Sequence, residues 1–357
     1  MYRLLTAGTI LGLIACADPG PLGPLGSETQ EQRQLFESLG KGVISPAYAK
    51  LHAESEGFVV AVEETCSTDS EQPELTQLHG PWRSLMSAWQ AIEIVRFGPS
   101  EEQNNRLRIQ FFPDANNAVE KGVDGLLVLG SDVTEVRVAE GNVGAQGIPA
   151  LVFLLFEANE DRDSTTLCPT LKSISSNLAS ITNHLADAWS DDGQTFKDFT
   201  GARGTFVDQA SVLTLVVESL ATELEYITSK KIQRPLNVGV QGLESWGSEH
   251  SVENLVTNVR TLQLFLTGGD LETDYGWLDY LRRVHQADQL SDDIEQRTAQ
   301  ILETLDSIEV SASNLLDTQN PEVLQLLYTE LQRLSDLVKE SAQIADLSLG
   351  FNSMDGD

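Results

Sequence analysis

Apolar side chains recur along most of this chain at the spacing of an α-helix. The clearest segment spans residues 169–189, where apolar residues follow one another at steps of three and four and so form one stripe on a helix. That stripe consists of Leu171, Ile174, Leu178, Ile181, Leu185 and Ala188. Pro169 suits the first turn, where its missing N–H costs no hydrogen bond. Such a stripe must be buried, so the chain is expected to fold as packed helices.

The same periodicity predicts further helices on both sides of this segment. They are expected over residues 31–66, 75–97, 147–156, 204–230, 255–266, 290–308 and from 321 onward. Gly268-Gly269 is a stop signal for the helix over 255–266. The alternation typical of a strand occurs only at residues 133–138. The chain is therefore predicted to be all-α and built of helical bundles, and its 357 residues suggest two domains.

Residues 98–147 interrupt the helical pattern. Glycines recur through this stretch and the sequence Phe112-Pro113-Asp114 lies within it. An irregular excursion of this length in a bundle protein is more often functional than a simple connection. We therefore expect residues from this excursion to contribute to a functional site.

The first sixteen residues have the pattern of a lipoprotein signal. One arginine precedes an apolar stretch at residues 4–15, which is too short to span a bilayer. It ends in Leu13-Ile14-Ala15-Cys16, which resembles the bacterial lipobox, so Cys16 is the predicted lipidation site. Residues 1–15 are then the signal peptide and 16–30 a flexible tether. The alternative is an ordinary secretory signal in which the cysteine is incidental.

This signal predicts a location in the cell envelope. Ala17, rather than aspartate, follows Cys16, which favours the outer membrane, facing the periplasm, with the lipid as the membrane contact. No later stretch is long and apolar enough for a transmembrane helix. The net charge of −31 argues against nucleic-acid binding, which needs Lys and Arg to neutralise phosphates. An acidic, well-solvated surface is the simplest explanation of that charge.

Two cysteines remain besides Cys16. Cys66 and Cys168 form an even pair in a chain expected in an oxidising compartment, so a disulfide between them is predicted. Free buried thiols are the alternative.

Several blocks of this sequence, taken in order, resemble the imelysin family of bacterial envelope proteins. The resemblance covers essentially the whole chain after the signal. The blocks contain Trp82, Arg83, Trp89, Glu93 and Phe97-Gly98-Pro99; Phe112-Pro113-Asp114; Lys231-Ile232-Gln233-Arg234-Pro235-Leu236; Ser248 and Ser251; and Leu349-Gly350-Phe351-Asn352 with Asp355-Gly356-Asp357. The resemblance implies two helical bundles packed side by side, here residues 31–195 and 196–357, with a functional cleft between them. It also implies a role in iron-regulated envelope physiology.

The family's proposed metal motif is Gly-x-His-x-x-Glu, and this chain departs from it. Aligned on Gly147, the motif places Pro149 at the histidine and Val152 at the glutamate. Neither side chain has a lone pair for a metal ion or for activating water. A zinc peptidase needs about three protein ligands, so the expected protein has no catalytic residues. No cofactor is assigned, although iron or another divalent cation is the group that the resemblance suggests.

Four residues in the resembling blocks are candidates for cleft binding: Arg83, Glu93, Asp114 and Ser251. Each has a structural alternative. Arg83 and Glu93 could belong to an Arg–Glu network that joins the bundles. Asp114 could cap a helix that follows it.

Other metal candidates are weaker. His250 and Glu253 have ligand spacing, but capping near a helix start, with Ser248 as the cap, explains this pattern as well. Asn352, Asp355 and Asp357 could collect a hard cation. The five tryptophans are expected to be core anchors.

Three functions remain open on this sequence. The first is a non-catalytic imelysin-like lipoprotein that binds a small ligand, a metal complex or an envelope protein in the cleft, in iron acquisition. The second is a metallopeptidase-type hydrolase that uses ligands outside the motif. The third is a structural or assembly factor of the envelope.

Overall fold

The computed structural model describes residues 27–67, 73–157, 164–269, 274–317 and 321–350. Within those ranges every regular element is a helix, which confirms the all-α prediction. Cys16, the signal peptide, most of the tether and the terminal Asn352, Asp355 and Asp357 lie outside the described residues. None of the helices in the described ranges is both long and apolar enough to cross a membrane.

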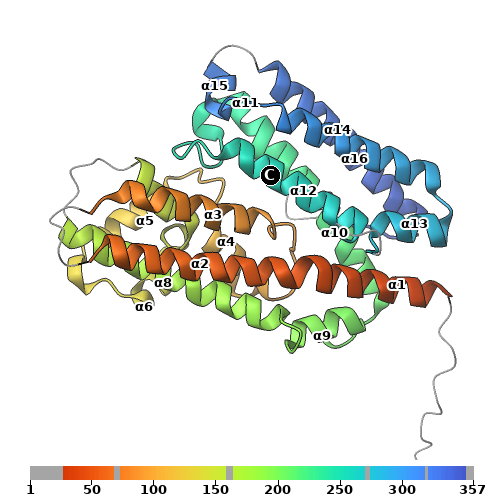
Figure 1. Ribbon diagram of the computed structural model, residues 1–357, viewed down its shortest axis with the longest axis horizontal. Coiled ribbons are helices and arrows are strands. Elements are labelled where there is room, and N and C mark those ends of the chain that lie inside the picture. Colours follow the sequence, from red (N-terminus) through yellow and green to blue (C-terminus); the bar gives the residue numbers. More distant parts are fainter. Residues whose placement is uncertain (1–26, 68–72, 158–163, 270–273, 318–320, 351–357) are drawn as a thin grey trace, which may run out of the picture.

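The first bundle is built around two long antiparallel helices, α2 and α8, with α3 packed against α2 (Figure 1). Its main elements are α1 (Ser27–Ser38), the π-helical turn η1 (Leu39–Ile44), α2 (Ser45–Thr65), η2 (Leu75–Leu78), α3 (His79–Gln90), α8 (Ser164–Trp189) and α9 (Gln194–Gly201). The predicted stripe on α8 is buried: Leu171, Ile174 and Leu185 are fully inaccessible. Its burial against α2 provides the main apolar contact of this bundle.

The second bundle packs α10, α12, α14 and α16 together (Figure 1). Its elements are α10 (Gln209–Tyr226), the π-helical turn η9 (Ile227–Gln233), α11 (Arg234–Val238), η10 (Val240–Gly242), α12 (Ser251–Thr267), α13 (Trp277–His285), α14 (Asp288–Asp306), α15 (Ala312–Asp317) and α16 (Glu322–Ile344). α12 ends at Gly268, which has φ +85°, a left-handed conformation that glycine adopts without strain. The stop signal in the sequence is therefore confirmed.

The two bundles lie side by side, as Figure 1 shows, and share one continuous apolar core. Contacts between α3 and α12 join them along their length, and α1 also reaches α10 and α13. The predicted boundary between residues 195 and 196 falls within the first turn of α9, which still packs on α1 and α8. The chain therefore enters the second bundle with α10.

The irregular excursion at 98–147 is present and consists of short elements. They are η3 (Gly98–Ser100), η4 (Glu102–Asn104), α4 (Asn105–Ile109), α5 (Ala118–Leu127), η5 (Gly130–Asp132), α6 (Glu135–Ala139) and η6 (Val143–Ala145). The one short strand candidate, residues 133–138, is not a strand, because α6 begins at Glu135. The Thr134 hydroxyl caps α6 by accepting from Arg137 N at 3.3 Å. Six alternating residues were too few to distinguish a strand from one turn of helix.

Two helices differ in length from their predictions. α8 begins at Ser164, so Pro169 lies inside this helix instead of in its first turn. α3 ends at Gln90 instead of continuing to 97, and tighter turns follow, with Ile92 N donating to Trp89 O at 3.0 Å. These turns direct Glu93 toward the second bundle. The apolar segment 147–156 is helical, as α7 (Ile148–Val152) and the π-helical turn η7 (Phe153–Glu157). Cys66, just after α2, forms a disulfide with Cys168 in α8.

Candidate functional site

A cavity of about 550 Å³ lies between the two bundles. The first bundle contributes the segment around Gln110 to Glu120 together with α7 and η7, and the second contributes the segment from α11 to Trp246. Both ligand positions of the degenerate motif belong to its wall. Its wall includes Gln110, Phe112, Asp114, Glu120, Pro149, Val152, Glu157, Arg234, Glu244 and Trp246.

Gly147 positions the motif helix against the excursion. A side chain at this residue would place its Cβ 2.2 Å from the backbone oxygens of Arg108 and of Ile109. Only glycine permits this approach, and α7 begins directly after it, with Pro149 in its first turn. The wall of the cavity at this point is therefore formed by the apolar side chains of Pro149 and Val152. These positions do not fit a metal ion.

We expect the variant Gly147→Ala to lower the free energy of unfolding by about 1–3 kcal/mol, because the new methyl group forces two backbone carbonyls apart. Urea denaturation followed by circular dichroism measures this. Gly57→Ala is the matched control, since nothing lies within 4 Å of its Cβ position and α2 is helical there. That control should be neutral or slightly stabilising. Equal stability of the two variants would contradict the close approach.

Asp114 lies in the cavity wall, but its carboxylate oxygens already accept hydrogen bonds from backbone amides. Oδ1 accepts from Asn116 N at 3.2 Å and Ala118 N at 2.9 Å, and Oδ2 accepts from Val119 N at 2.9 Å. These bonds satisfy orphan donors at the start of α5. The carboxylate therefore acts as a helix cap and has little capacity left for a ligand.

Behind the cavity, Lys231 links the bundles through a buried polar network. Its Nζ lies 2.5 Å from Glu93 Oε2 and 3.0 Å from Glu244 Oε2, and it donates to Gln90 Oε1 at 2.6 Å and Asn258 Oδ1 at 2.9 Å. Its side chain is only 2% exposed. Burial by itself lowers the pKa of Lys231, but the charges of Glu244 and Glu93 outweigh this effect and leave that pKa above its usual value. Lys231 is therefore a permanent cation at the bundle interface.

The pKa values of the two carboxylates that share this cation are shifted in opposite directions. Burial tends to raise the pKa of Glu93, but Lys231, Arg106 and Arg96 hold it below its usual value. Burial raises the pKa of Glu244, and Lys231 offsets only part of that rise. The reason is that Glu93 has further cations beside it, including Arg106 at 3.7 Å, whereas Lys231 is the one cation of the described residues at ion-pair distance from Glu244.

Neutral donors surround Glu244. Gln110 Nε2 donates to Oε1 at 2.7 Å and Asn254 Nδ2 donates to Oε2 at 3.1 Å. The backbone oxygen of Glu244 accepts from the Ser251 hydroxyl. Although Glu244 borders the cavity, its oxygens are already used.

A second layer of charges extends this network past Tyr226. Arg96 pairs with Glu223 at 2.8 Å, and the guanidinium carbons of Arg96 and Arg106 lie 4.7 and 5.5 Å from the Tyr226 ring centroid. The Tyr226 hydroxyl donates to Phe112 O at 2.9 Å. The ring therefore connects the buried charges to the cavity wall.

The remaining candidate residues do not gather in the cavity. Arg83 is exposed and donates to Ser248 O at 3.4 Å, so the cations of Glu93 are Lys231 and Arg106 instead. Ser251 begins α12 and holds the Glu244 backbone. The expected Ser248 cap is wrong, because its hydroxyl donates to Ser245 O at 3.0 Å.

His250 bridges the bundles instead of binding at a cleft. Its Nε2 lies 3.1 Å from Ser87 Oγ, while its Nδ1 is 3.8 Å from Glu253 Oε2. Burial, with a contribution from Arg83, lowers the pKa of His250 despite the opposing charge of Glu253. Within the described parts of the chain, no three His, Cys, Asp or Glu side chains form a group that could hold a metal ion.

Trp246 corrects the expectation that all five tryptophans are core anchors. Trp82, Trp89, Trp189 and Trp277 are at most 1% exposed, but Trp246 is 40% exposed and lines the cavity.

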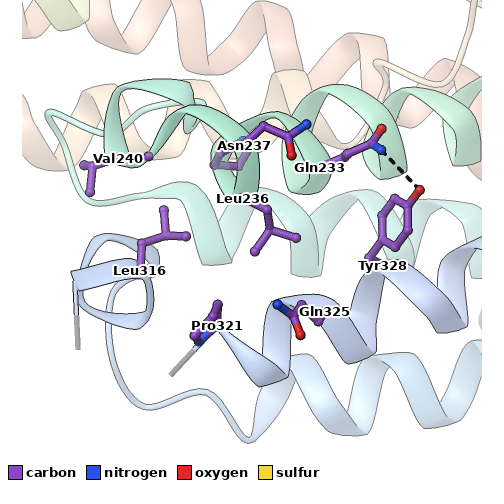
Figure 2. Close-up of a pocket in the computed structure, with 10 residues that line it drawn as sticks. Gln233, Leu236, Asn237, Val240, Leu316, Pro321, Gln325 and Tyr328 are labelled. Carbon is purple, nitrogen blue, oxygen red and sulfur yellow. Dashed lines mark hydrogen bonds between the residues drawn. The ribbon is translucent and has the colours of Figure 1, made fainter. Parts of the chain in front are cut away.

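A second cavity, of about 510 Å³, lies inside the second bundle (Figure 2). The Tyr328 hydroxyl at its edge accepts from Gln233 Nε2 at 3.3 Å and from Gln332 Nε2 at 2.8 Å. Its described lining residues carry no charge and include neither motif position. The cavity between the bundles is therefore the better candidate site.

Sequence reasoning missed Lys231 and Glu244 as members of the interface. Lys231 stood in a block that resembles the family, so its place in that block was the available signal. For Glu244 the sequence offered none, because one glutamate in an acidic chain is inconspicuous.

Comparisons with known proteins agree with this architecture. The family model described as imelysin matches residues 44–340. An imelysin-like protein from Psychrobacter arcticum 273-4 has a similar crystal structure, with a TM-score of 0.75, 21% identity, and coverage of 90% of this chain and 98% of that one. The crystal structure of a "putative iron-regulated protein A precursor" from Parabacteroides distasonis ATCC 8503 is also similar, with a TM-score of 0.72 and 17% identity. This match covers 89% of this chain and 97% of that one. No curated protein matches the sequence. From the match to the family model, the chain belongs to the imelysin family.

Proposed function

We propose that this imelysin-family protein is a non-catalytic lipoprotein of the bacterial cell envelope. In this proposal Cys16 carries the lipid and the cavity between the bundles binds a small organic ligand, or a metal complex of one, in iron acquisition. The observation that carries it is the cavity itself, whose wall at both motif positions is apolar. A metal entering such a cavity has to bring its own ligands, because Asp114 and Glu244 are already occupied.

Two further points support this proposal. Similarity to a protein described as iron-regulated favours the iron pathway. The hydrolase alternative needs a base and an electrophile near one point. Pro149 and Val152 supply neither, and the oxygens of Asp114 and Glu244 are used by other groups.

Calorimetric titration with ferrioxamine B, a ferric complex of an organic trihydroxamate, tests ligand binding. We expect saturable one-to-one binding by the wild type and at least about a tenfold loss of affinity in Val152→Trp, which fills the cavity. Val136→Trp is the control, because Val136 is 63% exposed and lies outside the cavity wall. Absence of binding, or equal binding by both variants, would overturn the proposal. Stoichiometric zinc in chelator-free protein would favour the hydrolase instead.

The anchor is tested by Cys16→Ala, which is expected to abolish labelling with a radioactive fatty acid and to move the protein out of the membrane fraction. The thiol of Cys16 is the acceptor for the lipid, so no other residue should replace it. A variant with serine at Cys66 and Cys168 is the control and should keep its label. Unchanged labelling of Cys16→Ala would refute this part of the proposal.

A further inference from the structure

The polar groups that line the inter-bundle cavity include hydrogen-bond acceptors for which the described residues supply no donor. Glu120 and Glu157 line it, and neither has an ion-pair or hydrogen-bond partner among the described residues. Gln110 also lines the cavity and is 5% exposed. Its Nε2 is committed to Glu244, while no residue in the described ranges donates to its buried Oε1. A buried acceptor without a donor is costly, so a donor supplied by a ligand would stabilise it.

The two carboxylates influence each other, and Glu157 is partly buried whereas Glu120 is exposed. Burial raises the pKa of Glu157, and the charge of Glu120 raises it further. Glu157 is packed so closely on the second bundle that a Cβ at Gly247 would lie 2.6 Å from its Cγ. A positive group placed beside this pair would relieve the repulsion and would compensate Glu157 for its lost hydration.

The rest of the lining suits a cation on an apolar body. Four aromatic residues belong to the cavity wall: Phe111, Phe112, Phe153 and Trp246. The faces of aromatic rings attract ammonium and guanidinium groups. The Arg234 guanidinium carbon already lies 6.0 Å from the Phe112 ring centroid, which shows that this ring accepts a cation. Arg234 occupies that part of the wall, so the acidic pair is the place for a ligand's charge.

We infer that the cavity recognises an organic cation, an ammonium or guanidinium group carried on an apolar body, with Glu120, Glu157 and Gln110 Oε1 as its acceptors. This inference rests on the proposed use of the cavity as a binding site and names the ligand class. An organic cation fits better than a bare metal ion, since no group of three metal-binding side chains exists in the described residues. The other charged groups facing the cavity are Asp114, held by backbone amides, Glu244, paired with Lys231, and Arg234.

Titration with phenethylammonium, with phenethyl alcohol as its neutral counterpart, tests the inference by calorimetry. We expect the ammonium to bind at least about tenfold more tightly than the alcohol. Glu157→Gln should weaken the ammonium about tenfold and leave the alcohol unchanged. Glu140→Gln, an exposed carboxylate outside the cavity, removes the same charge and is the control. Glu120→Gln replaces Glu157→Gln if the latter fails to fold.

Equal affinity for the alcohol, equal losses in Glu157→Gln and Glu140→Gln, or unchanged ammonium binding in Val152→Trp would overturn the inference. In each case attraction would come from the acidic surface as a whole or from apolar contact alone. Ferrioxamine B, which has a terminal ammonium group, separates the two proposals. If ferrioxamine B fails to bind while phenethylammonium binds, the proposed function is contradicted and the inferred ligand class is supported. If ferrioxamine B and its N-acetylated, neutral form bind equally, only the inferred ligand class is contradicted.

Discussion

Replacement of Lys231 by methionine is expected to lower the free energy of unfolding by about 3–5 kcal/mol. Lys231 is the cation between two buried carboxylates, 2.5 Å from Glu93 and 3.0 Å from Glu244. Methionine fills a similar volume, so the main loss is electrostatic. The variant leaves Glu93 and Glu244 buried with less compensation and removes a donor from Gln90 and Asn258. Urea denaturation at pH 7 measures the change.

The loss of folding stability caused by Lys231→Met should depend on pH. The raised pKa of Glu244 means that this group is the first to become neutral in the folded state as the pH falls. The lowered pKa of Glu93 contributes stability above its unfolded value, and that stability is lost as the pH falls through its folded value. The raised pKa of Lys231 contributes stability that is lost only as the pH rises through its folded value, on the alkaline side. The cost of Lys231→Met is therefore expected to be smaller in mild acid than at pH 7.

Two comparisons make this prediction specific. Lys41→Met removes an exposed lysine whose partner, Glu37, is also exposed, and should change stability by less than about 0.5 kcal/mol. Adding Glu244→Gln to Lys231→Met should recover part of the loss, because it removes one uncompensated charge. Equal stability of Lys231→Met and Lys41→Met would contradict the buried network. It would also be contradicted if Glu244→Gln lowered the free energy of unfolding as much in the Lys231→Met variant as in the wild type.

Replacement of both Cys66 and Cys168 by serine is expected to lower the free energy of unfolding by about 2–5 kcal/mol. The disulfide closes a loop between residues 102 positions apart, so it removes a large set of unfolded conformations. It also ties the end of α2 to the first turns of α8, the helix against which α2 packs. Denaturation with and without reductant measures this.

Reductant provides the matched control for the disulfide. It should destabilise the wild type by the same amount as the double substitution and have no effect on the double variant. Mass spectrometry after alkylation without reductant should find both cysteines protected. Two freely alkylated thiols, or a reductant effect in the double variant, would contradict the assignment.

Local helix signals were predictable because they depend on neighbours in sequence. The stripe from Leu171 to Leu185 lies on α8, and Gly268 ends α12 as expected. The same reasoning failed at residues 133–138, where the pattern was too short, and at the end of α3. It also misplaced Trp246, since residue type alone does not tell a core tryptophan from one beside a cavity.

By itself the sequence determined the helical class, the family blocks and the missing ligand side chains at Pro149 and Val152. These are properties of residue identity and short spacing. Only the tertiary structure decided that Lys231 lies between Glu93 and Glu244, and that Asp114 is a cap. Glu93 and Lys231 are 138 positions apart, and such a contact depends on how two bundles pack rather than on any local pattern.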